Sequence, residues 1–179
     1  MRLILVRHPR PLVAAGLCYG STDLAVAPDE LARAHAALTA TLPSDLPVFS
    51  SPLERCAGLA RRLAGAAARF DPRLVEMDFG RWEMRAWDDI PRAEVDDWAA
   101  DLAGYRPGGG ETVLEVAARV SAFHADLERA GTASAIVLCH AGTMRLLAAC
   151  HAGMAPPDMA RHAAATPHAI AYGASITLA

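Results

Sequence analysis

The chain alternates between short apolar runs and longer segments in which apolar residues recur every three or four positions. Short continuous apolar runs are typical of strands buried on both faces of a sheet. The final segment alternates apolar and polar residues, which also favours a strand. The predicted strands cover residues 2–6, 46–50, 73–80, 134–140 and 168–179.

Four segments have the spacing or the end signals of helices. Pro28 and two acids begin the first, and Ser51, Pro52 and Glu54 predict an N-cap, a first helical residue and a capping box for the second. A single apolar face follows Glu111. The predicted helices cover residues 28–42, 51–70, 111–130 and 142–153.

Strands that alternate with helices predict a three-layer α/β/α sandwich with a mostly parallel central sheet. We expect one domain over residues 1–179, with a helical, lid-like excursion at about 81–110. The excursion contains Trp82, Trp87 and Trp98, which either pack the lid onto the sheet or stack on an aromatic ligand. The loop at 105–111 lacks the strand-before, helix-after context of a dinucleotide-binding loop.

Composition removes several classes of function. The net charge of −3 predicts no nucleic-acid or membrane partner. The chain has no Lys, Asn or Gln, so Schiff-base chemistry and a P-loop lysine are excluded and every side-chain cation apart from His is Arg. This Arg usage reflects either genome composition or a need for bidentate contact with phosphate or carboxylate.

Cysteine spacing and the length of the apolar runs predict the cellular location. The four cysteines form no CxxC motif, and we read them as reduced thiols of a cytoplasmic protein. The first apolar run is too short for a signal peptide, and no stretch is long enough to span a membrane. The remaining histidines show no convincing zinc spacing, so no metal and no cofactor is expected.

Charged side chains gather where the predicted strands end. Arg7 and His8 follow the first strand, His140 follows a later one, Arg55 lies in the first turn of a helix, and Glu76 ends "RLVE". Ligands of such sheets bind at the carboxyl ends of the strands. Two Arg can hold phosphate oxygens, a neutral His8 can attack phosphorus, a charged His140 can donate to the oxyanion, and Glu76 can transfer protons.

The roles of several further residues near this set are not fixed by the sequence. The amide of Ala141, at a helix start, would add a phosphate donor. Asp78 competes with Glu76 as the proton donor. Ser21 and Thr22 either bind the substrate or form a turn, and Glu83 is expected to anchor a loop.

Six ordered stretches resemble the histidine phosphatase superfamily, the phosphoglycerate mutase-like family. They are "LVRH", "GSTD", "SSPLERC", "VEMDFGRWE", "PGGGET" and "VLCHAG". The resemblance implies that His8 is the phosphorylated nucleophile, that Arg7, Arg55 and His140 bind phosphate, and that Glu76 is the proton donor. "GLCYGSTDLAV" and the short length resemble the α-ribazole phosphatase branch, which acts in cobalamin assembly.

One stretch departs from the family. The family usually has Gly after the first His, then an acid or amide residue and Thr, whereas this chain has Pro9, Arg10 and Pro11. Two prolines remove backbone donors, and Arg10 could substitute as a third cation toward the substrate. The residues and the resemblance together predict a phosphomonoesterase that acts through a phosphohistidine on a small-molecule phosphomonoester, and the resemblance favours α-ribazole 5′-phosphate as that substrate. The alternatives are a broad sugar-phosphate or nucleotide phosphatase, a mutase-like enzyme, or a non-catalytic phospho-ligand binding module; the composition permits a homodimer without requiring one.

Overall fold

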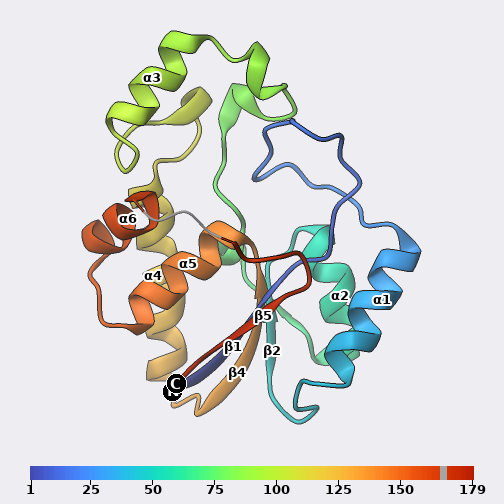
Figure 1. Cartoon of the computed structure of the whole chain (residues 1–179). Helices are drawn as coiled ribbons and strands as arrows, with labels where there is room; N and C mark the ends of the chain where they lie inside the picture. The colour runs from blue at the N-terminus through green and yellow to red at the C-terminus, as the bar shows by residue number, and fades with distance from the viewer. Residues whose placement is uncertain (166–168) are drawn as a thin grey trace.

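A computed structural model describes residues 1–165 and 169–179. Its centre is a five-stranded sheet with the order β3-β2-β4-β1-β5 (Figure 1). Neighbouring strands are parallel except β5, which runs antiparallel to β1. The strands are β1 (Arg2–Arg7), β2 (Val48–Ser50), β3 (Arg69–Phe70), β4 (Ser134–Cys139) and β5 (Ser175–Leu178).

Helices cover both faces of the sheet, as the strand–helix alternation predicts (Figure 1). Helices α1 (Pro28–Thr39) and α2 (Glu54–Ala64) cover one face, and α4 (Val113–Arg129), α5 (Ala141–His151) and α6 (Pro156–Ala165) cover the other. Successive β1 residues alternate between these layers, with Leu3 and Leu5 in the α4–α6 core and Ile4 and Val6 in the α1–α2 core. The prediction of a three-layer, mostly parallel fold is confirmed.

The predicted excursion lies beyond the carboxyl edge of β1, β2 and β4 (Figure 1). It contains the α3 helix (Arg92–Ala100) and short 3-10 helices at Gly80–Trp82, Trp87–Asp89 and Pro107–Gly109. Trp82 is fully buried, and the rings of Trp87 and Trp98 stack at 6.0 Å with an interplanar angle of 7°. Trp82 therefore forms the packed interior of the excursion, whereas Trp87 stays 38% exposed and Trp98 is partly buried.

Two local predictions are wrong. The second helix begins at Glu54 rather than at Pro52, and no capping box forms, because Leu53 occupies the N-cap and the Glu54 amide donates to Asp23 Oδ1 at 2.7 Å. Ser51 remains in the buried approach to the helix, where its amide donates to the Leu138 carbonyl. The helix ends at Ala64, and the next residue has a φ of 56° that suits glycine.

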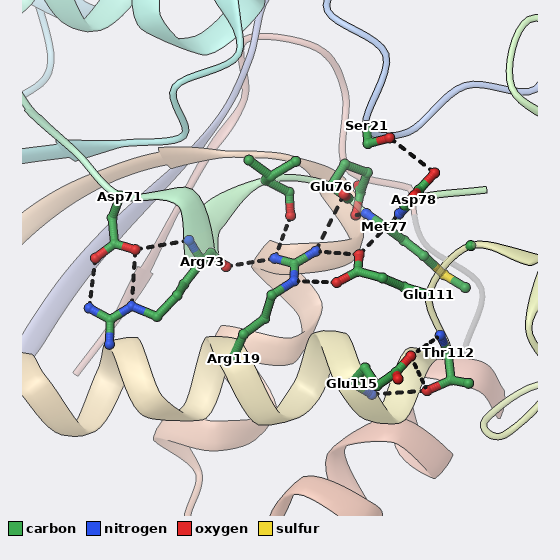
Figure 2. A network of polar contacts seen from close by, with 12 residues as sticks. Ser21, Asp71, Arg73, Glu76, Met77, Asp78, Glu111, Thr112, Glu115 and Arg119 are labelled. Carbon is green, nitrogen blue, oxygen red and sulfur yellow. Dashed lines mark hydrogen bonds and ion pairs between the residues drawn. The ribbon is translucent and has the colours of Figure 1, made fainter. Parts of the chain in front are cut away.

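The strand predicted over residues 73–80 does not form. The segment begins with a 3-10 turn, Pro72–Leu74, and the only strand nearby is β3, which precedes it. Asp71 caps that turn by accepting from the Arg73 amide at 2.9 Å. The carbonyls that a strand would pair with a neighbour are instead bound by Arg119 of α4 (Figure 2).

The remaining boundaries differ by smaller amounts. The helix predicted from Glu111 begins two residues later, at Val113, after a complete capping box formed by Thr112 and Glu115. The last strand is confirmed only at 175–178, and the start predicted at 168 lies outside the described residues. Helix α6 has no counterpart in the sequence prediction, although Pro156, Pro157 and Asp158 are helix-start signals.

Candidate active site

Parallel pairing of β1 with β4 brings the two strand-end histidines together. Arg7 is in register with Cys139, so His8 and His140 follow at adjacent strand ends. Their ring centroids are 5.0 Å apart, and the His8 amide donates to the Cys139 carbonyl at 3.1 Å. The clustering predicted from the ends of the strands is therefore present in the structure.

His8 is held in a defined tautomer. Its Nδ1 lies 2.7 Å from the Pro9 carbonyl oxygen, which can only accept, so Nδ1 carries the hydrogen and Nε2 keeps its lone pair. The side chain is 2% exposed. Burial, followed by the charges of Arg55 and Arg7, lowers the pKa of His8 to about 3, so the ring is neutral near pH 7.

Arg55 is fixed by backbone carbonyls from the loop before α1. Its side chain is fully buried; Nη1 donates to the Thr22 carbonyl at 2.7 Å and Nη2 donates to the Gly20 carbonyl. Its Nε donates to His140 Nδ1 at 3.2 Å. No carboxylate neutralises Arg55 among these contacts, so its charge remains available to an anion in the cavity.

Arg7 is anchored by the segment that precedes β5. Its Nη1 donates to the Ile170 carbonyl at 2.5 Å, and its guanidinium carbon lies 4.0 Å from the centroid of the Tyr172 ring. The Tyr172 hydroxyl is 2.6 Å from the Tyr19 hydroxyl. Cation–π contact and one carbonyl thus orient the guanidinium without neutralising it.

His140 is buried behind His8. Because Arg55 donates to its Nδ1, its Nε2 carries the hydrogen and donates to Ser51 Oγ at 3.0 Å. Burial and the charge of Arg55 hold the pKa of His140 well below its ordinary value. His140 is therefore a neutral ring that accepts from Arg55 and packs against His8.

Glu76 and Asp78 face different surroundings. Glu76 lines the cavity, where its Oε2 accepts from the Gly142 amide at 2.9 Å and its Oε1 accepts from the Met77 amide at 3.1 Å. Asp78 Oδ1 instead accepts from the Gly80 amide at 2.7 Å and from Ser21 Oγ at 3.2 Å. Of the two acids, Glu76 is the one that lines the same cavity as His8 and the two Arg side chains.

The cavity has a volume of about 530 Å³ and two chemically distinct ends. Arg7, His8, Arg55 and Glu76 form one end, beside the first residues of α5, Ala141 and Gly142. The other end is apolar apart from Arg145. Its walls are Met77, Phe79, Trp98, Leu102, Val113, Val116, Leu146 and residues 163–165.

The three residues predicted as further substrate contacts are not among the described cavity walls. Arg10 is exposed, with its guanidinium carbon 5.2 Å from the Tyr172 ring centroid. The Ser21 and Thr22 hydroxyls both donate to Glu83, at 3.4 and 2.5 Å. Glu83 also accepts from the amides of Gly20, Ser21, Thr22 and Phe79, and it anchors the loop as expected.

Sequence reasoning missed most of the apolar wall and two wall residues with polar side chains, Tyr19 and Arg145. Tyr19 lines the phosphate end, with the Arg55 guanidinium carbon 5.6 Å from its ring centroid. Arg145 lines the apolar end and donates to the Ala163 carbonyl. Arg145 follows Ala141 by four residues, the spacing that puts two side chains on one helix face, so helical periodicity from His140 could have identified it.

Comparison with known proteins identifies the family of the chain. A sequence model described as "Histidine phosphatase superfamily (branch 1)" matches residues 3–172. The chain belongs to the histidine phosphatase superfamily. No curated protein sequence matches it significantly.

Solved structures of this superfamily's fold align along almost the whole chain. The α-ribazole phosphatase of Shigella flexneri is 28% identical, with a TM-score of 0.81 over 99% of this chain and 89% of that chain. A Thermus thermophilus protein is 29% identical, with a TM-score of 0.72 over 99% and 93%. A mycobacterial glucosyl-3-phosphoglycerate phosphatase is 23% identical, with a TM-score of 0.79 over 99% and 92%, and it shows likeness of fold alone.

The structure also bears on metal binding and on membrane spans. The described residues contain no group of three or more His, Cys, Asp or Glu side chains arranged to hold a metal ion. Within the same residues, no helix is both long enough and apolar enough to cross a membrane.

Proposed function

We propose that this superfamily member is a phosphomonoesterase that works through phosphorylated His8. The observation that carries the proposal is the state of His8: a neutral ring with its Nδ1–H donated to Pro9 and its Nε2 lone pair free. An imidazole kept unprotonated by burial, with a further contribution from two guanidinium groups, suits nucleophilic attack on a phosphate that the same guanidinium groups bind.

His8 and Glu76 carry the two chemical steps of the proposed reaction. His8 Nε2 attacks phosphorus, the P–N bond forms, and the ester P–O bond breaks. Protonated Glu76 gives its proton to the departing alkoxide. Glu76 then takes a proton from water, whose oxygen attacks phosphorus, and the P–N bond breaks to return neutral His8.

Charge stabilisation comes from groups at the same end of the cavity. Arg7 and Arg55 bind the phosphoryl oxygens, and the Ala141 amide at the start of α5 adds a backbone donor. His140 supports the phosphate site by holding Arg55 in place through Nδ1. These fixed donors supply the positive charge, so the proposed reaction needs no metal.

The apolar end of the cavity indicates which kind of leaving group the site would accept. Trp98 and Phe79 offer aromatic surface, and aliphatic side chains form most of the remaining wall. A flat aromatic leaving group would bury more apolar area here than a sugar. Together with the similarity to the Shigella α-ribazole phosphatase, this favours α-ribazole 5′-phosphate, an intermediate of cobalamin assembly, as the substrate.

A substrate panel tests the proposal. Purified protein in EDTA is assayed for phosphate release from α-ribazole 5′-phosphate, sugar phosphates, mononucleotides and 3-phosphoglycerate, with His8→Ala as control. We expect the highest kcat/KM for α-ribazole 5′-phosphate and no turnover by His8→Ala.

The other outcomes separate the parts of the proposal. Similar kcat/KM values across the panel, lost in His8→Ala, would retain the phosphohistidine mechanism and reject the substrate. Turnover that needs a metal, or that survives His8→Ala, would reject the mechanism. Tight phosphate binding without turnover on any compound would identify a phospho-ligand binding module instead.

A further inference from the structure

The backbone that carries Glu76 is held by a side chain instead of a neighbouring strand. Arg119 of α4 donates from Nη1 to the carbonyls of Arg73 at 2.7 Å and Val75 at 2.6 Å (Figure 2). Its Nη2 donates to the Glu76 carbonyl at 3.3 Å. One guanidinium thus fixes three carbonyls within four consecutive residues.

Glu111 completes this arrangement from the other side of Glu76. Arg119 donates from Nε and Nη2 to Glu111 Oε1 and Oε2, both at 2.9 Å. Glu111 Oε2 also accepts from the Asp78 amide at 3.1 Å, and the Glu111 amide donates to the Asp78 carbonyl at 2.8 Å. The Arg119–Glu111 pair therefore holds the chain on both sides of Glu76 (Figure 2).

We propose that Arg119 and Glu111 are positioning residues that set the location of the Glu76 carboxyl group for proton transfer. Neither side chain lines the described cavity, so both act through the backbone at residues 73–78. The Glu76 side chain has its own contact at the far end, the Gly142 amide at 2.9 Å. Backbone and carboxylate are thus fixed separately, and the inference rests on Glu76 being the proton donor.

The chemistry of the pair is specific to Arg. A guanidinium can bind a carboxylate with two parallel hydrogen bonds and still donate to carbonyls, whereas the Lys ammonium is a compact charge with three donors. An error of about 1 Å in a catalytic group can cost on the order of 10²-fold in rate. Arg119→Lys keeps the charge but loses the geometry, and the isosteric Glu111→Gln loses the bidentate ion pair.

Leaving-group dependence distinguishes positioning from general loss of structure. A poor leaving group, such as the alcohol of an alkyl phosphate, needs a proton from Glu76, whereas p-nitrophenolate leaves with little help. We expect Arg119→Lys and Glu111→Gln to lower kcat about tenfold or more on the alkyl phosphate and about threefold or less on p-nitrophenyl phosphate. Thermal denaturation confirms that each variant is folded at the assay temperature.

Arg73→Lys is the matched control. Arg73 lies in the same network, but its guanidinium pairs with Asp71 at 2.7 Å (Figure 2) and with Asp126 at 2.7 Å. It makes none of the contacts to residues 75–78 described above. We expect its ratio of rates on the two substrates to equal that of the unmodified protein. A shifted ratio in Arg73→Lys would overturn the specific role of Arg119.

A double variant completes the test. Once Glu76→Gln has removed the proton donor, adding Arg119→Lys is expected to change the alkyl phosphate rate by less than about twofold, because the two changes act on one step. If Glu76→Gln discriminates between the leaving groups and neither Arg119→Lys nor Glu111→Gln does, the positioning role is refuted and the proposed function stands. If Glu76→Gln slows both substrates equally, Glu76 is not the proton donor and the positioning role fails with it, whereas phosphorylation of His8 is decided separately by His8→Ala.

Discussion

Gly142 offers a test in which activity and stability are expected to change in opposite directions. It is the second residue of α5, and its amide donates to Glu76 Oε2. A Cβ added at this position would lie 2.5 Å from Glu76 Oε1 and 3.1 Å from Oε2. In Gly142→Ala, the carboxylate at the end of a flexible side chain must move while the helix stays in place.

The size of both effects follows from this geometry. Ordinary contact begins at 3.4 Å, so Oε1 must retreat by roughly 0.9 Å, a displacement of the size that costs catalytic groups on the order of 10- to 100-fold. Replacing Gly by Ala inside a helix stabilises by roughly 0.5–1 kcal/mol. We expect a fold at least as stable as the unmodified protein and a 10- to 100-fold lower kcat on an alkyl phosphate.

Gly58→Ala is the matched control for this change. Gly58 lies within α2, where an added Cβ would be 3.2 Å from Glu54 Oε1 and 3.5 Å from Leu31 Cδ2, with no atom of Glu76 among its nearest neighbours. Thermal denaturation and kcat on alkyl and p-nitrophenyl phosphates are measured for both variants. Gly58→Ala is expected to leave both rates unchanged and to gain similar helix stability.

Two results would refute the reasoning. Full activity of Gly142→Ala on the alkyl phosphate would show that the position of the Glu76 carboxylate does not limit the rate. A loss of stability by several kcal/mol would show that the carboxylate cannot move aside as its flexibility suggests.

Two further predictions concern the phosphate end of the cavity. The pKa of His8 in the folded protein is about 3, below the ordinary value of 6.5, so the unfolded chain binds the extra proton and the free energy of unfolding falls as pH falls from 6.5 toward 3. In urea denaturation from pH 7 to 4, the free energy of unfolding of His8→Asn is expected to fall less steeply than that of the unmodified protein, by up to about 1.4 kcal/mol per pH unit. Parallel curves for the two proteins would contradict this. Glu83→Ala leaves the amides of Gly20, Thr22 and Phe79 without their acceptor and is expected to cost about 3 kcal/mol or more in urea denaturation. Because that loop supplies the carbonyls that hold Arg55, inhibition by inorganic phosphate should weaken as well, and unchanged inhibition would argue against the loop's role.

The strand ends were predictable because burial leaves a strong signal in the sequence. β1 and β4 are buried on both faces and therefore read as unbroken apolar runs that stop at Arg7 and at His140. Once the sheet is taken as parallel, the ends must meet at one edge. The prediction thus placed His8 and His140 on one rim of the sheet, but the direct pairing of β1 with β4, which brings the two rings to 5.0 Å, required the structure.

The contacts that hold the site residues in place were harder to predict from the sequence. Ser51 has the local sequence of an N-cap, but its hydroxyl faces His140 and the helix begins three residues later. Residues 73–80 have the composition of a strand, but Arg119 replaces the neighbouring strand as the source of hydrogen bonds. Both errors arise because tertiary partners, which lie 89 and 44–46 positions away in the chain, override the local pattern.

The Pro9–Arg10–Pro11 loop shows why a departure from the family pattern need not disable the nucleophile. Proline removes a backbone donor but keeps its carbonyl, and the His8 ring uses only an acceptor, the Pro9 oxygen at 2.7 Å. The next residues are tied down by the Leu12 amide, which donates to the Ala25 carbonyl at 2.8 Å, while the Arg10 side chain stays exposed beside Tyr172. The loop therefore stiffens the support of His8 and changes the charge near the outer face of the phosphate site. We expect its effect on turnover to appear in substrate preference, with the protonation state of His8 unchanged.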